Sequence, residues 1–241
     1  MARLKVIAVD CSPLLAQEEK TQALYSKYLP SQEIKTLQRF RQFHDKARSA
    51  LGRILLRQTL LEYTASPAAT PRDFVIDAQP GQKPRLTNAS ICPTVSDFNI
   101  AHDGSWIVVG VTETGLIGVD VAQARLHGGE SADDLATIFA SELTTDEQQY
   151  LKYKSPNKLL DFYTIWAVKE AYVKATGEGI LGGLTRINVV MENGCLVDTE
   201  VDGKRCPLAI TTRAIDDGQY IIAVACDHAS DIQVVPVCNL L

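Results

Sequence analysis

The chain has 241 residues, of which 46% are hydrophobic and 22% are charged, as is typical of soluble globular proteins. Its net charge of −5 argues against a general nucleic-acid binder, because such a protein needs a basic surface to neutralise phosphates. The six cysteines are scattered without a CxxC pair, which disfavours a zinc site and fits a reduced intracellular setting. No apolar run approaches the length of a signal-peptide core or a membrane span, so we expect a cytoplasmic protein that does not contact membranes.

The first part of the chain predicts a strand, a helix and a hairpin. Residues 4–9 alternate and are rich in β-branched side chains, which indicates a strand. Residues 45–63 carry an apolar stripe at helical spacing, with basic residues on the opposite side. Residues 97–102 and 106–112 predict two strands, and Asp103-Gly104 between them is a strong hairpin signal.

The second part repeats this order of elements. Residues 115–121 predict a buried strand, and Thr144 to Glu147 is a capping sequence that starts a helix. Residues 162–176 predict a long helix, because they contain no Gly or Pro and are followed by Gly177, which suits a left-handed helix end. Three closing strands are predicted at residues 187–192, 208–213 and 220–226.

The repeated order predicts an α+β fold with two pseudo-symmetric halves. Each half is expected to pack a small antiparallel sheet on helices. We place the N-terminal half at residues 1–114 and the C-terminal half at residues 115–241. The active site is expected in the cleft between them, since such clefts commonly bind ligands.

The helix at residues 162–176 places a carboxylate, a cation and an aromatic ring on one face. Trp166, Glu170 and Lys174 are four residues apart, so they lie one above the other. Taken alone, Glu170 and Lys174 fit an ordinary helix salt bridge equally well.

Asp120 lies within the apolar run of the strand at residues 115–121. A carboxylate buried there is costly unless a cation or a hydrogen-bond donor meets it, although a strand end or edge position explains it equally well. Asp120 and Glu170 are a suitable pair for Mg²⁺, which usually takes one or two protein carboxylates and completes its shell with water and phosphate oxygens.

Several basic residues are candidates for phosphate contacts. Lys83 lies between Pro80 and Pro84 in a predicted turn, and His102 ends the strand before the hairpin turn. An ammonium group, or a protonated imidazole, suits a phosphate. The region at residues 35–57 is the most basic of the chain, although a solvated face explains it equally well. Its candidates include Lys35, Arg39, Arg41, Lys46 and Arg48. The chain has no Walker A, GxGxxG, HExxH or GxSxG motif.

Three segments in this order resemble a known family. They are Phe98 to His102, Gly118 to Val121 and Trp166 to Lys174, the last with a WxxKExxxK pattern. Together with Gln82-Lys83-Pro84 and Leu51-Gly52-Arg53, they resemble the 4′-phosphopantetheinyl transferase family of the Sfp type, whose members work as monomers with two pseudo-symmetric halves. The resemblance runs from about residue 31 to residue 184.

The resemblance implies a reaction and a metal site. Coenzyme A would donate its phosphopantetheine arm to a conserved serine of a carrier protein and release 3′,5′-ADP. Asp120 and Glu170 match the family residues that hold Mg²⁺, with Mn²⁺ as an alternative. Ala122 stands where many members have a second acid, so a water is expected at that metal position. Lys174 matches the lysine near the phosphates, and Glu170 is our candidate for the general base, directly or through a water.

The resemblance also implies coenzyme A contacts. Lys83 and the segment from Asn99 to His102 match the coenzyme A-binding stretches. In the family, basic residues just before an RF-type segment contact the adenosine 3′-phosphate, and Lys35 and Arg39 lie near that position in this sequence. Ala101 stands where many members have Ser, so one hydroxyl contact is absent.

Three functional hypotheses follow. The first is the transferase, acting on an acyl carrier, a peptidyl carrier or an aminoadipate reductase carrier domain. The second is a Mg²⁺-dependent hydrolase that cleaves coenzyme A with water. The third is a non-catalytic module that binds coenzyme A or a carrier. The presence of both Asp120 and Glu170 favours the transferase over the binding module.

Overall fold

The computed structural model describes residues 2–77, 82–126, 128–129, 131–179 and 183–236. The chain divides into two compact units. The first comprises the chain up to Ile117 together with the segment from Ser230 onward, and the second comprises Gly118–Ala229. The turn residues Pro80 and Gly81 beside Lys83 lie outside the described residues.

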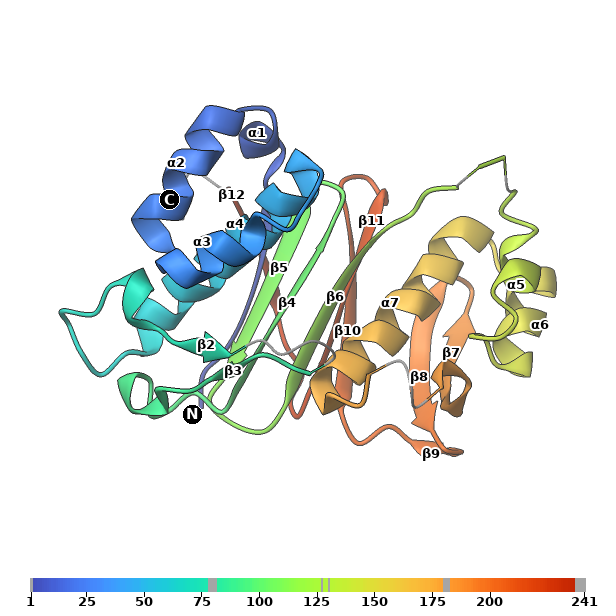
Figure 1. The fold of residues 1–241 in the computed structure, drawn as a ribbon. Helices are drawn as coiled ribbons and strands as arrows, with labels where there is room; N and C mark the ends of the chain where they lie inside the picture. Colours follow the sequence, from blue (N-terminus) through green and yellow to red (C-terminus); the bar gives the residue numbers. More distant parts are fainter. Residues whose placement is uncertain (1, 78–81, 127, 130, 180–182, 237–241) are drawn as a thin grey trace. The chain divides into compact units, whose positions relative to one another are not determined.

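The first unit is built on a four-stranded sheet in the order β12-β1-β5-β4 (Figure 1). Its strands are β1 (Leu4–Asp10), β4 (Asp97–Asp103), β5 (Trp106–Thr112) and β12 (Ile232–Pro236). β5 pairs antiparallel with its hairpin partner β4 on one side and with the distant strand β1 on the other, whereas β1 and β12 pair parallel. The β4–β5 hairpin predicted from Asp103-Gly104 is confirmed, and Gly104 adopts a φ of 53° in its turn.

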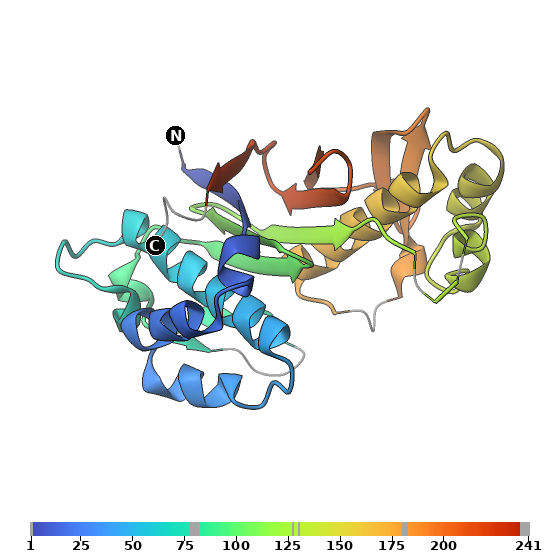
Figure 2. The ribbon, with the colours of Figure 1, turned by 90° about the horizontal axis from the view of Figure 1, so that it is seen from above.

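The first unit also contains four helices among the described residues, which are α1 (Ser12–Leu15), α2 (Glu18–Tyr28), α3 (Ser31–Leu37) and α4 (Phe43–Leu60). Two short strands, β2 (Ile76–Asp77) and β3 (Arg85–Leu86), pair with each other in a separate sheet. Short 3-10 turns occur at Leu61–Tyr63, Pro71–Asp73 and Ala89–Ile91. α4 lies along β4 and β5 and buries its apolar stripe there (Figure 1; Figure 2). The predicted helix at residues 45–63 is therefore confirmed as α4, with its last turn tightened into the 3-10 turn.

The second unit contains two small sheets and one long helix. One sheet has the order β10-β11-β6 and the other β7-β8-β9. The strands are β6 (Ile117–Gln123), β7 (Ile187–Glu192), β8 (Cys195–Val201), β9 (Lys204–Arg205), β10 (Ala209–Ile215) and β11 (Tyr220–Cys226). The helices are α5 (Leu135–Ile138), α6 (Thr145–Tyr153) and α7 (Lys158–Thr176), with a 3-10 turn at Leu184–Arg186.

α7 is the central helix of the second unit and packs on β11 (Figure 2). Asn157 caps its start by accepting a hydrogen bond from the Leu160 amide at 3.2 Å, and Gly177 ends it in the left-handed conformation with a φ of 72°. Eleven residues of α7 are buried, which explains why it is apolar on most sides. The predicted helix at residues 162–176 starts four residues after α7 does and ends at the same residue.

The α+β class predicted from the sequence is confirmed, with one long helix on a small sheet in each unit. The prediction missed the helices α1 and α2 and the strands β3, β8, β9 and β12. β8 reads CLVDTEV, in which charged residues interrupt the apolar positions, so its pattern is weak. The sequence places the segment from Ser230 onward in the C-terminal half, but β12 pairs with β1 and belongs to the first unit. Pairing between distant segments leaves no local sequence signal.

Candidate active site

One face of α7 carries the polar residues at the spacing that the sequence predicts. Between residues 161 and 175, the partly exposed side chains are Tyr163, Trp166, Glu170 and Lys174. The residues between them point into the core of the second unit. The burial pattern therefore confirms that Trp166, Glu170 and Lys174 share a face, and this face is the part of α7 that a ligand can reach.

Asp120 and Lys174 form an ion pair within the second unit. The Nζ atom of Lys174 donates to Oδ1 of Asp120 at 2.5 Å. The Asp120 side chain is 9% exposed and the Lys174 side chain is 30% exposed. The costly carboxylate in an apolar strand is thus met by a cation from α7, as the sequence required.

The approach of β6 to α7 depends on a glycine. A β-carbon at Gly118 would lie 2.0 Å from the carbonyl oxygen of Ala171 and 2.3 Å from the amide nitrogen of Ala175. Side chains alternate along a strand, so Gly118 and Asp120 point to the same side of β6. The glycine lets the two backbones touch, and this contact brings Asp120 within reach of α7.

Glu170 has a carboxylate oxygen with no donor. Its Oε1 atom is buried and has no hydrogen-bond partner among the described residues. An ionised carboxylate accepts only, so a buried oxygen of this kind calls for a cation or a donor from a ligand. Glu170 and Lys174 are one helical turn apart, which places their β-carbons about 5–6 Å from each other.

These residues fit a magnesium ion. The part of the chain that the structure describes has no group of three or more His, Cys, Asp or Glu side chains suited to a metal. Mg²⁺ does not need one, because it commonly binds one or two carboxylates and takes its other oxygens from water and phosphate. The unpartnered oxygen of Glu170, one turn from the lysine that holds Asp120, suits this incomplete kind of protein site.

Lys83 is held inside the first unit. Its Nζ atom donates to the carbonyl oxygen of Ile117 at 2.8 Å and forms an ion pair with Asp97. Burial lowers the pKa of Lys83 below its usual value, and the adjacent Asp97 carboxylate opposes this shift. The structure thus gives the ammonium group internal partners, and its contact with coenzyme A stays a prediction.

Asn99 and His102 lie on β4, but they point to opposite faces of the strand because they are three positions apart. Asn99 is buried and His102 is exposed. Only one of the two therefore faces a given side of the sheet, as their odd spacing along the predicted strand requires.

A cation from α4 binds the end of the β4–β5 hairpin near His102. Arg48 on α4 donates from Nη1 to the carbonyl oxygen of Gly104 at 3.0 Å, and it forms an ion pair with Asp45. The sequence identifies Arg48 only as part of a basic region. Its link to the turn two residues after His102 depends on the packing of α4 against the hairpin, which has no local signal.

The remaining basic residues of this region divide into two groups. Arg53 and Arg57 form ion pairs with Glu33, so their charges are already neutralised within the first unit. Arg39 and Arg41 are exposed between α3 and α4, Lys35 is exposed on α3, and Lys46 is half-buried on α4. These residues are therefore the part of the basic region that is open to an anionic ligand or partner.

Comparison with known proteins agrees with this arrangement. Residues 16–114 match the family described as 4′-phosphopantetheinyl transferase, N-terminal, and residues 116–225 match the 4′-phosphopantetheinyl transferase superfamily. In the described residues, no helix is both long and apolar enough to cross a membrane.

Individual relatives carry related names. The 4′-phosphopantetheinyl transferase pptA of Paxillus involutus is 30% identical over 195 residues, which span 74% of this chain and 72% of that protein. The 4′-phosphopantetheinyl transferase ffp of Bacillus subtilis is 28% identical over 236 residues, or 96% of this chain and 97% of that protein. The L-aminoadipate-semialdehyde dehydrogenase-phosphopantetheinyl transferase of Xenopus laevis is 30% identical over 164 residues, or 63% and 52%. The chain belongs to the 4′-phosphopantetheinyl transferase family and is a transferase of this class.

Proposed function

We propose that this chain transfers the phosphopantetheine arm of coenzyme A to a serine of a carrier protein. The observation that carries the proposal is the buried, unpartnered Oε1 of Glu170, one helical turn from the lysine that binds Asp120. Family membership supplies the reaction class, and these three side chains supply groups suited to a pyrophosphate and its counter-ion.

The proposed reaction is a displacement at phosphorus. The serine oxygen attacks the β-phosphorus of coenzyme A, and the bond from this phosphorus to the bridging oxygen breaks. The leaving group is 3′,5′-ADP, which carries away the electron pair of the broken bond. Mg²⁺, or Mn²⁺ in its place, supplies positive charge that stabilises the phosphoryl oxygens when it is bound.

The chain's own residues would position and activate these groups. Asp120 and Glu170 would hold the metal with their carboxylates. Lys174 would place its ammonium group against the phosphoryl oxygens, where negative charge grows as the bond breaks. Glu170 would take the proton from the serine hydroxyl.

The carrier is proposed to be an acyl, peptidyl or aminoadipate reductase carrier domain. The name of the Xenopus laevis relative supports the last of these as one candidate. Lys83, Asn99, His102 and Arg39 are proposed to contact coenzyme A. We further propose that the chain acts as a monomer, which light scattering of the purified protein in solution tests directly.

The experiment is intact-mass analysis of apo carrier proteins incubated with this chain, coenzyme A and Mg²⁺. We expect a gain of one phosphopantetheinyl group that disappears with EDTA and with Glu170→Gln. Coenzyme A cleavage without carrier modification would support the hydrolase instead. Coenzyme A binding with neither reaction, across carriers of all three kinds, would support the binding module.

A further inference from the structure

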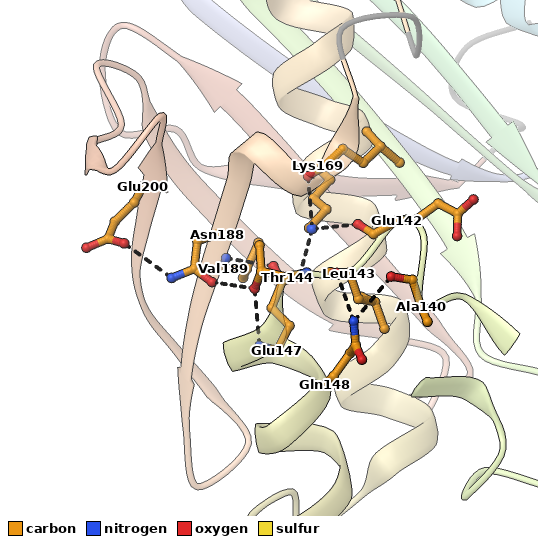
Figure 3. A network of polar contacts seen from close by, with 11 residues as sticks. Ala140, Glu142, Leu143, Thr144, Glu147, Gln148, Lys169, Asn188, Val189 and Glu200 are labelled. Atoms are coloured by element: carbon orange, nitrogen blue, oxygen red, sulfur yellow. Dashed lines mark hydrogen bonds and ion pairs between the residues drawn. The ribbon is translucent and has the colours of Figure 1, made fainter. Parts of the chain in front are cut away.

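Next to Glu170 in the chain lies a lysine that no part of the proposed reaction uses. Lys169 is 1% exposed and points into the interior of the second unit (Figure 3). Its Nζ atom lies 2.7 Å from Oε2 of Glu147, and it donates to the carbonyl oxygens of Glu142 at 2.8 Å and Leu184 at 3.0 Å. An ammonium group has three hydrogens, so these three partners satisfy it completely.

Glu147 is equally well held. Its side chain is fully buried, its Oε1 atom accepts from the Val189 amide at 2.8 Å, and its Oε2 atom accepts from the Thr144 amide at 2.7 Å. Thr144 in turn donates its hydroxyl to Asn188 at 2.7 Å. One glutamate thus caps α6, contacts β7 and receives the lysine from α7 (Figure 3).

The Lys169–Glu147 pair carries a large desolvation cost, so net stabilisation of the fold does not explain it well. Two charges are removed from water, and apolar residues of similar volume at such positions are often neutral or stabilising. The geometric effect of the pair is different from that of an apolar contact. The three partners of Lys169 come from the loop before α6, from α6 itself and from the turn before β7, so they restrain the ammonium group from several directions.

Such a restraint controls the rotation of α7 about its axis. Successive residues of a helix are turned by about 100°, so Glu170 points to a direction set by that of Lys169. If α7 rotated, Lys169 would lose its partners and the face of Glu170 and Lys174 would turn away from Asp120. Van der Waals contact with β6 at Gly118 limits how closely α7 approaches, but this contact does not by itself specify how α7 is rotated about its axis.

We propose that Lys169 is a positioning residue for the transfer reaction, and that its ion pair with Glu147 holds Glu170 and Lys174 in their working direction. This inference rests on the role of Glu170 in the proposed function. Lys169 touches neither substrate nor metal in this account. It acts through the orientation of its neighbour.

The test compares Lys169→Met with a control of similar instability. Leu208→Ala shortens a core side chain of the same unit and takes no part in the hydrogen bonds of this network. Each variant is assayed at least ten degrees below its own Tm. We expect Lys169→Met to lose at least tenfold in kcat with little change in the KM for the carrier, while Leu208→Ala stays within twofold of the natural chain.

A second readout does not depend on activity. The chain has two tryptophans, so a fluorotryptophan-labelled sample gives two ¹⁹F resonances, and Trp166 reports on the face of α7 that carries Glu170. We expect Lys169→Met to shift the Trp166 resonance and Leu208→Ala to leave it in place. An unshifted resonance, or equal loss of kcat in both variants, would show that Lys169 only stabilises the fold.

The double variant Lys169→Met/Glu147→Gln covers the case in which the single variant does not fold. Removing both charges leaves no uncompensated ion, so we expect its Tm to rise above that of Lys169→Met while kcat stays low. Full kcat in the double variant would overturn the proposal. Full kcat in Glu170→Gln would overturn the proposed function instead, and the ¹⁹F shift would still show whether Lys169 orients α7.

Discussion

The backbone of β6 touches α7 at Gly118, where a β-carbon would lie 2.0 Å from the carbonyl oxygen of Ala171. No side chain fits in that space, because the obstructing atoms belong to helix backbone and cannot rotate away. The consequence reaches Asp120, two residues along the same strand, whose carboxylate meets Lys174. A glycine two residues before the carboxylate is therefore a steric requirement of this site.

The first prediction concerns this contact. Gly118→Ala must push β6 away from α7, and we expect a loss of about 3 kcal/mol or more in the free energy of unfolding, at the upper end of overpacking effects. We also expect loss of transferase activity, since Asp120 moves with the strand. Urea unfolding and the carrier-modification assay measure the two effects.

Gly52→Ala is the matched control for that experiment. A β-carbon at Gly52 would meet the side-chain atom Cγ2 of Ile100 at 3.0 Å, and a side chain has more room to adjust than backbone. Alanine also raises helix propensity in α4. We expect a markedly smaller effect than at Gly118, and equal effects at both glycines would contradict the steric explanation.

The second prediction concerns Lys174. Replacing it with methionine removes the cation beside Asp120, and we expect kcat to fall by about a hundredfold, as when one transition-state donor is removed. The variant leaves the nearly buried Asp120 carboxylate without this cation, so we also expect a lower Tm, and kcat is measured at least ten degrees below it. Lys152→Met, at an exposed lysine on α6, is the control and should keep full activity. Unchanged kcat in Lys174→Met would exclude the lysine from the reaction.

The third prediction concerns the ion pair inside the first unit. Arg57 is fully buried and pairs with Glu33, which also binds Arg53 at 3.2 Å. Arg57→Met leaves Glu33 with its second cation, so we expect a loss of about 3 kcal/mol in the free energy of unfolding. Glu33→Gln leaves a buried guanidinium without a carboxylate and should cost more, about 4–5 kcal/mol.

The double variant Arg57→Met/Glu33→Gln tests whether the two losses come from the interaction between Arg57 and Glu33. It contains no uncompensated buried charge, so its loss should be clearly smaller than the sum of the two single losses. Chemical denaturation of the four proteins completes the cycle. Simple additivity would mean that the two residues act independently.

The fourth prediction concerns thiol reactivity. Burial raises the pKa of Cys11 to about 12, so its thiolate fraction at pH 8 is on the order of 10⁻⁴. Burial also raises the pKa of Cys92 and Cys206. Cys195 is exposed at the start of β8. Among these four cysteines, iodoacetamide should modify Cys195 first, and peptide mass analysis after short exposure checks the order. Early labelling of Cys11 in folded protein would contradict its burial.

The fifth prediction concerns stability at acid pH. Asp73 accepts hydrogen bonds at Oδ2 from the amide of Thr70 at 2.7 Å and from its hydroxyl at 2.8 Å, and these bonds lower the pKa of Asp73 below its usual value. A folded pKa below the unfolded one stabilises the fold at pH values above the unfolded pKa, which is about 3.9 for an aspartate. The benefit is lost as the pH falls through the folded pKa.

Asp73→Asn tests this sign. The natural chain should have a higher Tm than the variant at pH 5–7, and the difference should shrink as the pH falls below about 3.9. Thermal melts of both proteins from pH 7 to the acid limit of folding measure it. A difference that does not change with pH would mean that the charge of Asp73 does not contribute to stability through its hydrogen bonds from Thr70.

The sequence by itself determined the features that depend on neighbours in the chain. The fourfold spacing of Trp166, Glu170 and Lys174, the cap at Thr144 and the glycine end of α7 are local, so helix periodicity and capping chemistry were enough to predict them. The family resemblance rested on such local motifs and was confirmed by both family matches.

Only the tertiary structure decided which distant groups meet. The pairing of Lys174 with Asp120, the internal partners of Lys83 and the return of β12 to β1 each join residues far apart in the chain. Lys169 is the clearest case, since its sequence position beside Glu170 gives no sign that it is buried against Glu147. Spacing specifies which face of a helix a residue occupies, but the partner on that face is chosen by packing among segments that the spacing cannot relate.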